Sequence, residues 1–207
     1  MAVFLANVGV NAAHTARSPL HPDGSFTLIP IPEPMKWRPP MLRLKDLPEI
    51  AFEAPEALGR IAVHPDPDFR SDPPTYGDNC RRAARAYALR RAHKGDRIVF
   101  LARLHPRNSP PAFYLVGELV VDEVLPDITQ DPGPGWWDRN AHVRRARATN
   151  EWDSFWVFKG GAGSGFYEKA RPFRKEETDR LMTVNWRPNR TELQTIGSYT
   201  RTIRAIG

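Results

Sequence analysis

The distribution of proline is the strongest constraint on how this 207-residue chain can fold. The chain has 21 prolines, and eleven of them lie between residues 30 and 74. Because proline fixes φ and has no backbone N–H, this segment cannot hold a long helix or a central strand. It is still too apolar for disorder, with Trp37, Leu44 and Phe52 among its residues. We therefore expect residues 30–74 to form an ordered, extended excursion within one domain that spans residues 1–207.

Outside this segment, the apolar pattern predicts short elements. The clearest helix is expected over Asp78–His93, ended by Gly95, and the strands Arg97–Leu104 and Phe113–Leu125 should form an antiparallel hairpin. Further expected elements are a strand at residues 1–6, a helix over Trp136–Ala148, a strand over Ser154–Lys159, a helix over Glu176–Met182 and an edge strand over Tyr199–Ile206. Short elements that pair locally predict an α+β fold with a curved, mostly antiparallel sheet or a partly closed barrel.

The single cysteine, Cys80, excludes an internal disulfide and a cysteine-based metal cluster. The longest apolar runs, such as Ile98–Ala102, are too short to cross a membrane. The first residues lack the basic and apolar regions of a signal peptide, so they are read as a strand. We therefore expect a soluble protein of the bacterial cytoplasm.

The charge favours nucleic acid as a partner. The chain has 30 Lys and Arg against 24 Asp and Glu, a net charge of +6, and 24 of the 30 basic residues are arginines. Arginine binds phosphates and guanine bidentately and stacks on bases. A GC-rich genome would also replace lysine by arginine, so the composition leaves both explanations open.

Catalytic and metal-binding signatures are mostly absent. The six histidines have no metal-ligand spacing with a third ligand nearby, and the His21-Pro-Asp23 and His64-Pro-Asp66 tripeptides are read as turns. The sequence therefore predicts no metal and no cofactor. The glycine-rich residues 161–165 indicate either a tight turn or the floor of a pocket, where Lys159 and Ser164 would hold phosphate.

The segment that follows the first strand is unusually polar. Its side chains Asn7, Asn11 and His14 could read the edge of a base, while Arg17 and Ser18 could hold phosphate. An equally good interpretation is a polar loop whose side chains satisfy its own backbone.

Tryptophans cluster after residue 135, with arginines between them. Most of these rings must be core residues, but one or two could stack on a base. The candidates for stacking are Trp137 and Phe158, and Asn140 and His142 are further base-binding candidates. The neighbouring Arg144 and Arg145 are predicted to contact phosphates.

Several stretches of the sequence carry a resemblance to known families. Residues 4–11, the following Arg17-Ser-Pro-Leu20 and the later Gly163–Ala170 resemble the nucleotide-modification-associated domain families. The strand pair Gly95–Phe100 and Tyr114–Leu119 resembles that of the PUA-like superfamily, which includes EVE, YTH and ASCH domains. The resemblance covers about residues 2–205. It implies a PUA-like barrel with a concave pocket for one extruded, often modified, base.

The leading hypothesis is a noncatalytic module that recognises a modified or flipped nucleobase in DNA or RNA. An alternative is an enzyme acting on a nucleotide or modified base, with Asp78, Glu118, His142 and Glu168 as acid–base candidates. A third is a regulator that binds a small molecule or a nucleotide. In the leading hypothesis, the N-terminal polar loop and the Trp137–His142 segment meet at one pocket, because a flipped base needs both a stacking face and edge partners.

Overall fold

The hairpin expected in the middle of the sequence forms the centre of the fold. The computed structural model describes all residues except 55, 57–58, 82–83, 200–203 and 207. Strands β7 (Arg97–Pro106) and β8 (Ala112–Ile128) pair antiparallel, as predicted. Gly95 precedes β7 with a φ of +91°, and its N–H donates to the carbonyl of Val121 at 2.7 Å. Glycine adopts this left-handed backbone without strain, so the predicted turn is also confirmed.

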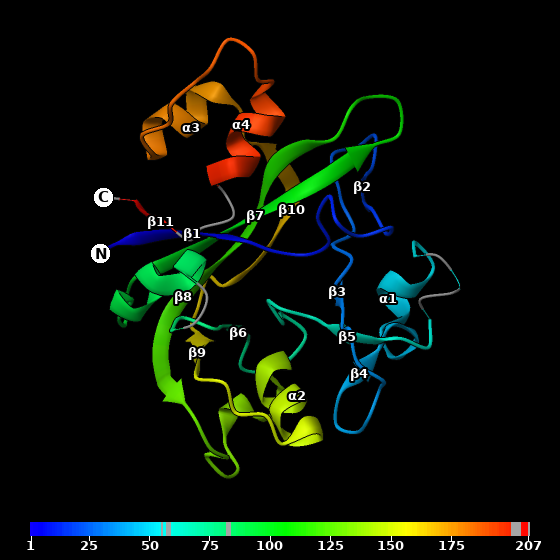
Figure 1. The fold of residues 1–207 in the computed structure, drawn as a ribbon, viewed down its shortest axis with the longest axis vertical. Coiled ribbons are helices and arrows are strands. Elements are labelled where there is room, and N and C mark those ends of the chain that lie inside the picture. Colours follow the sequence, from blue (N-terminus) through cyan, green and yellow to red (C-terminus); the bar gives the residue numbers. More distant parts are fainter. Residues whose placement is uncertain (55, 57–58, 82–83, 200–203, 207) are drawn as a thin grey trace.

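The main sheet has the strand order β11-β1-β7-β8-β9-β6, with β2 paired to β7 and β10 paired to β8 (Figure 1). The bounds of these other strands are β1 Val3–Asn7, β2 Ser18–Leu20, β6 Thr75–Asp78, β9 Phe155–Gly160, β10 Gly165–Pro172 and β11 Arg204–Ile206. β1 and β2 run parallel to β7, and the other pairs are antiparallel. The α+β class is therefore confirmed, but the described residues form an open mixed sheet and no closed barrel, and a PUA-like placement is not confirmed.

The length of β8 explains the curvature of the sheet. Its first half pairs with β7, and its second half pairs with β9 across register shifts at Val121/Glu123 and Leu125/Ile128. Such irregularities bend a strand and increase its twist. The β6–β9 end of the sheet therefore turns away from the β1–β7 end (Figure 1).

The helices are short, and four of them lie towards the two ends of the main sheet. The 3₁₀-helix η4 (Trp136–Arg139) and α2 (Ala141–Thr149) lie at one end, and α3 (Lys175–Leu181) and α4 (Glu192–Tyr199) lie at the other (Figure 1). The helix predicted over residues 176–182 is confirmed. The helix predicted over residues 136–148 is divided at Asn140, whose extended backbone separates η4 from α2. α4 and β10 were not predicted.

The helix expected over Asp78–His93 is wrong at its start. Asp78 is the last residue of β6, where it pairs with Trp156 of β9, and the described helical part is the 3₁₀-helix η3 (Ala84–Arg91). Residues 82–83 of the expected helix lie outside the described residues. No helix in the described parts of the chain is long and apolar enough to cross a membrane.

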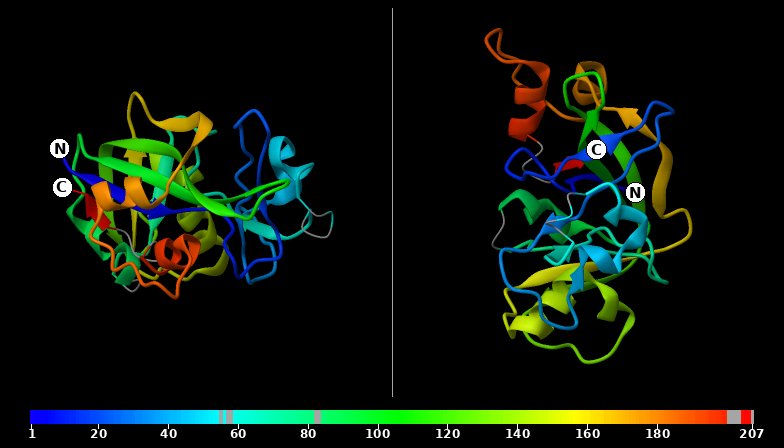
Figure 2. Two further views of the ribbon diagram at one scale, coloured as in Figure 1. Left: turned by 90° about the horizontal axis from the view of Figure 1, so that it is seen from above. Right: turned by 90° about the vertical axis from the view of Figure 1, so that its right-hand side faces the viewer.

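The proline-rich excursion has a small sheet of its own, beside the main sheet (Figures 1 and 2). Its elements are β3 Ile31–Pro32, β4 Leu42–Arg43, η1 Leu44–Asp46, α1 Pro48–Ala51 and β5 Ala62–His64, and its strand order is β3-β5-β4. Leu44, Leu47 and Val63 form a buried apolar cluster beneath it. Because frequent prolines limit ladder hydrogen bonding, the strands contain only two or three residues.

If this excursion is part of the cooperative fold, truncating its core will destabilise the protein. Leu44 is 1% exposed, so Leu44→Ala should lower the free energy of unfolding by about 2–5 kcal/mol. The control is Lys45→Ala at the exposed neighbouring position, which should change it by less than about 0.5 kcal/mol. Denaturant unfolding measures both, and equal effects of the two substitutions would contradict an ordered excursion.

Candidate functional site

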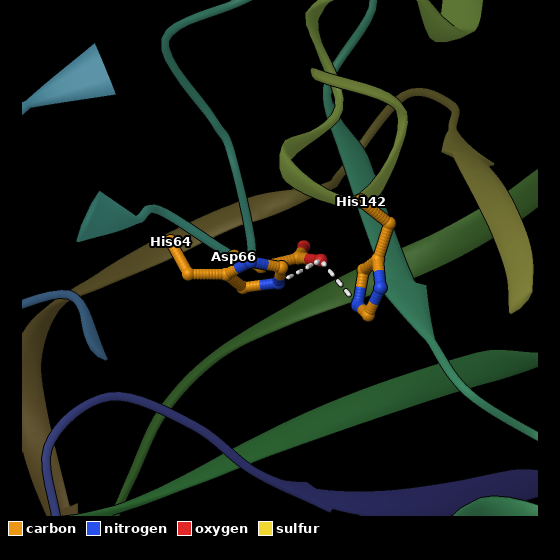
Figure 3. A group of neighbouring side chains, drawn as sticks. All are labelled: His64, Asp66 and His142. Atoms are coloured by element: carbon orange, nitrogen blue, oxygen red, sulfur yellow. Dashed lines mark ion pairs between the residues drawn. The ribbon is translucent and has the colours of Figure 1, made fainter. Parts of the chain in front are cut away.

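Two neighbouring residues, His64 and Asp66, meet the distant His142 near the junction of the excursion and the main sheet (Figure 3). His64 ends β5, Asp66 follows two residues later, and His142 lies in the first turn of α2. The Nε2 atoms of His64 and His142 each lie 3.7 Å from the same oxygen, Oδ2 of Asp66. One donor atom from each of the three residues lies within 4.8 Å of the others.

Each of these side chains is held by a neighbour. Nδ1 of His64 lies 2.9 Å from Oε1 of Glu33, and the Gly77 N–H donates to Asp66 Oδ2 at 2.8 Å. The ring of His142 stacks on Phe155 with the ring centroids 5.3 Å apart. Contacts of this kind limit rotation, so the three side chains are preorganised.

The protonation states follow from burial and charge. Burial alone would lower the pKa of His64, but hydrogen bonding and the charges of Asp66 and Glu33 outweigh it and raise the pKa to about 9. Burial raises the pKa of Asp66 to about 6. Burial would also raise the pKa of Glu33, but hydrogen bonding and the charge of His64 lower it overall. Without a bound cation, these carboxylates favour the protonated form of His64.

The cluster opens to a pocket of about 200 Å³. The pocket is lined by Asn7, Val8, Ile31, Pro32, Glu33, Pro34, His64, Asp66, Tyr76, Gly77, Asp78, His142 and Arg145. Asp66 also lines a second pocket of about 280 Å³, which includes Phe26, Leu28 and Phe166. A larger hollow of about 640 Å³ lies near the β7–β8 turn and α4 and contains no residue of the cluster. We therefore choose the candidate site by its titratable side chains and not by the volume of the pocket.

Three of the residues predicted to bind a base or phosphate line this pocket, namely Asn7, His142 and Arg145. The N-terminal strand and the segment around His142 therefore meet, although Asn11, His14, Arg17 and Ser18 are not in the lining. Asn140 is fully buried beside it, where its side chain accepts the His142 N–H at 3.0 Å and donates to Thr75 at 3.2 Å. Its position is that of an N-cap for α2.

The rest of the polar N-terminal segment satisfies its own backbone. The Asn11 side chain accepts the Ala13 N–H, and the Asn11 N–H donates to the ring of His14. Arg17 donates to the carbonyls of His14 and Ala16, and the buried Ser18 hydroxyl accepts the Ile29 N–H. These contacts match the alternative interpretation of this segment as a self-contained polar loop.

The two predicted stacking residues do not lie in the pocket. Phe158 is fully buried in the main core, so its ring has no face for a base, and this prediction is wrong. Trp137 packs on the apolar cluster around Val143, and its indole N–H donates to the Gly133 carbonyl at 2.9 Å. Large rings at these two positions stabilise the core.

The predicted phosphate-binding residues also have partners within the chain. Lys159 pairs with Asp122 at 3.0 Å and Glu123 at 3.5 Å, and the Ser164 hydroxyl accepts the Val120 N–H at 2.9 Å. Arg144 is half-buried, and burial lowers its pKa. Neither Arg144 nor these two residues line the pocket.

The acid–base candidates separate in the structure. Asp78 lies in the pocket with His142, and it accepts the Tyr76 hydroxyl at 2.9 Å. Glu118 pairs with Arg97 outside the pocket, and Glu168 lines the second pocket. Sequence reasoning missed His64 and Asp66, because the two identical His-Pro-Asp tripeptides were both read as turns. It also missed Glu33, which belongs to neither tripeptide. The one available signal was a His-x-Asp pair with a distant third histidine.

The family of the chain follows from comparison with known proteins. A family model described as nucleotide modification associated domain 3 matches residues 2–202. The chain belongs to this family. No curated protein and no solved structure matches the chain. The family is associated with nucleotide modification, so the His64–Asp66–His142 pocket belongs to a protein of that broad role.

Gly77 is the closest backbone approach to the cluster. A Cβ atom there would lie 2.6 Å from the ring of His142 and 2.9 Å from Oδ1 of Asn140. We expect Gly77→Ala to lower the free energy of unfolding by about 1–3 kcal/mol through overpacking. The control is Gly165→Ala, because a Cβ at Gly165 meets nothing within 4 Å. Thermal unfolding with calorimetry measures both, and equal stability of the two variants would contradict the packing described here.

The cysteine should be chemically inert. Cys80 is fully buried, and burial, followed by the charge of Asp78, raises the pKa of its thiol. Thiolate is the reactive form, so the native protein should react with an aromatic disulfide reagent only after unfolding. Rapid stoichiometric labelling of the native chain would contradict this placement.

Proposed function

We propose that this protein binds a nucleobase, or another small part of a nucleotide, in the His64–Asp66–His142 pocket and acts on it as an enzyme. The observation that carries the proposal is the partly buried group of titratable side chains that opens to a pocket. Two imidazoles and a carboxylate placed together in this way are typical of sites that move protons or hold a reacting group. The family's association with nucleotide modification supplies the substrate class.

The size of the pocket supports a small reacting group. Its volume of about 200 Å³ is below the roughly 300–1,000 Å³ of pockets that enclose drug-sized ligands. A single base is therefore a better match than a whole nucleotide. The remainder of a nucleotide or a nucleic-acid strand would lie outside the pocket, on the surface of this basic protein.

The lining contains groups suited to recognition. Asn7 supplies an amide, and amides form paired hydrogen bonds with base edges. Arg145 supplies a guanidinium that is paired with Asp153 at 3.1 Å and lines the same pocket. Its Nε is buried and has no hydrogen-bond partner among the described residues. These side chains favour a polar planar ligand such as a base.

The pocket favours an enzyme over a module that recognises a base by stacking. Apart from the two histidines, the only aromatic residue in the described lining is Tyr76. Tyr76 is 3% exposed, and its hydroxyl donates to Asp78. A cage that holds a modified base by stacking needs exposed ring faces. The noncatalytic interpretation of the sequence therefore has less support than the enzymatic one.

The proposal predicts that Arg145→Gln weakens nucleoside binding. The matched control is Arg147→Gln on the same helix, because Arg147 pairs with Asp131 and Asp138 and does not line the pocket. We expect Arg145→Gln to raise the dissociation constant about 10-fold or more, which is the loss of one charged hydrogen bond, while Arg147→Gln binds as the wild type. Calorimetric or NMR titration of nucleosides and short oligonucleotides with different modified bases, in the presence of a chelator, measures binding.

Mass spectrometry of the same oligonucleotides after incubation with divalent metals and air tests for a chemical change. A changed base supports the enzyme. Binding with no chemical change of any oligonucleotide would support the noncatalytic base reader instead. If no nucleoside or oligonucleotide binds, or if both substitutions weaken binding equally, the pocket is not a nucleobase site and the proposal is wrong.

A further inference from the structure

We propose that His64, Asp66 and His142 bind a divalent first-row transition-metal ion, Fe²⁺ or Zn²⁺, in the pocket. The proposal rests on the proposed function only for the identity of the substrate. The metal site itself is argued from the donor atoms, from the groups behind them and from the open side of the cluster.

The first argument is the spacing of the donors. Nε2 of His64 and Nε2 of His142 both face Oδ2 of Asp66 at 3.7 Å, which is too long for a hydrogen bond (Figure 3). Metal–ligand distances of roughly 2.0–2.2 Å place neighbouring ligands about 3–3.5 Å apart. The three donor atoms lie within 4.8 Å of one another, so they would have to move closer together to share one ion.

The second argument is an unsatisfied buried atom. The side chain of Asp66 is 4% exposed, and its Oδ1 is buried with no hydrogen-bond partner among the described residues. Buried carboxylate oxygens are rarely left without a partner. A cation bound by this carboxylate would compensate for its burial.

The third argument is the support behind the ligands. The Glu33 carboxylate lies 2.9 Å from the far nitrogen of His64, which leaves Nε2 of His64 to face the cluster. A histidine held by a carboxylate in this way is the usual outer arrangement of a metal-binding histidine. The N–H of Gly77, in β6, donates to Asp66 and orients its carboxylate, and the ring of Phe155 stacks on the ring of His142.

The donor set selects the class of ion. Two imidazoles and one carboxylate favour Fe²⁺ or Zn²⁺ over Mg²⁺ and Ca²⁺, which prefer oxygen ligands. Three protein ligands leave further coordination positions open, as in catalytic and not structural sites. Those positions would face the pocket, where Asn7 and Arg145 lie.

The test uses the untagged full chain, stripped with a chelator and measured without nucleotide. After Zn²⁺ or Fe²⁺ is added back and the unbound ion is removed, we expect one ion per chain by elemental analysis. We expect no comparable binding of Mg²⁺, and a visible absorption band when Co²⁺ is added instead. In NMR spectra of the ring nitrogens, zinc should shift the signals of His64 and His142 and leave those of His21 and His105 unchanged. These measurements need no variant, so they remain decisive if a substitution prevents folding.

Substitutions then locate the ion. Asp66→Asn keeps an oxygen for the Gly77 N–H but loses the charge, and Glu33→Gln removes only the supporting carboxylate. We expect Glu33→Gln to weaken zinc binding about 10–100-fold, and Asp66→Asn to weaken it more. The matched control is Asp23→Asn in the exposed His21-Pro-Asp23 tripeptide, which should bind as the wild type.

The proposed metal site would be wrong if the wild type binds no stoichiometric transition metal. It would also be wrong if Asp23→Asn and Asp66→Asn weaken zinc binding equally. Nucleoside binding is measured with a chelator present, so failure of the metal site and failure of the proposed function are separate results.

Discussion

The hydrogen bond from the Gly77 N–H to the Asp66 carboxylate, at 2.8 Å, is the contact on which the candidate site depends. A buried carboxylate is costly unless a donor or a charge compensates for it. The bond joins the end of the excursion to β6 of the main sheet, and the paired backbone groups of Asp68 and Thr75, at 2.9 and 3.0 Å, close the intervening loop. His142 approaches the same carboxylate oxygen from α2. The site is therefore assembled from three chain segments that are distant in sequence.

The sequence predicted those elements whose signals are local. The alternation in residues 97–104 and 113–125, with prolines between them, identified the β7–β8 hairpin. A helix was expected over residues 136–148, but the role of Asn140 as the N-cap of α2 was not predicted. The start of the Asp78–His93 helix was predicted wrongly, because the pairing of β6 with β9 is a contact between residues about 80 positions apart. Helical spacing in a sequence carries no information about such a partner.

The site was harder to predict than the fold, since residue type alone does not distinguish a ligand from a structural group. Asn11, Ser18 and Ser164 have side chains suited to recognition, but the side chain of each accepts a hydrogen bond from a backbone N–H of the chain itself. The two His-Pro-Asp tripeptides are identical in sequence, yet His21 lies beside Thr27 and Glu53, while His64 reaches Asp66, Glu33 and the neighbourhood of His142. The surroundings of the two tripeptides differ because the proline-rich excursion carries His64 and Asp66 to the main sheet.

The net charge of the protein says less about its ligand than the side chains of the pocket do, because some of the positive charges are paired within the chain. Some of the arginines that suggested nucleic acid are paired within the chain, as Arg43 is with Asp46, Arg147 with Asp131 and Arg145 with Asp153. Pairs of this kind reduce the positive potential that a phosphate backbone would meet. Arg145 differs from the other two because it also lines the pocket. Selectivity for a base would therefore arise from a small number of side chains around the Asp66 carboxylate and not from a broad basic surface.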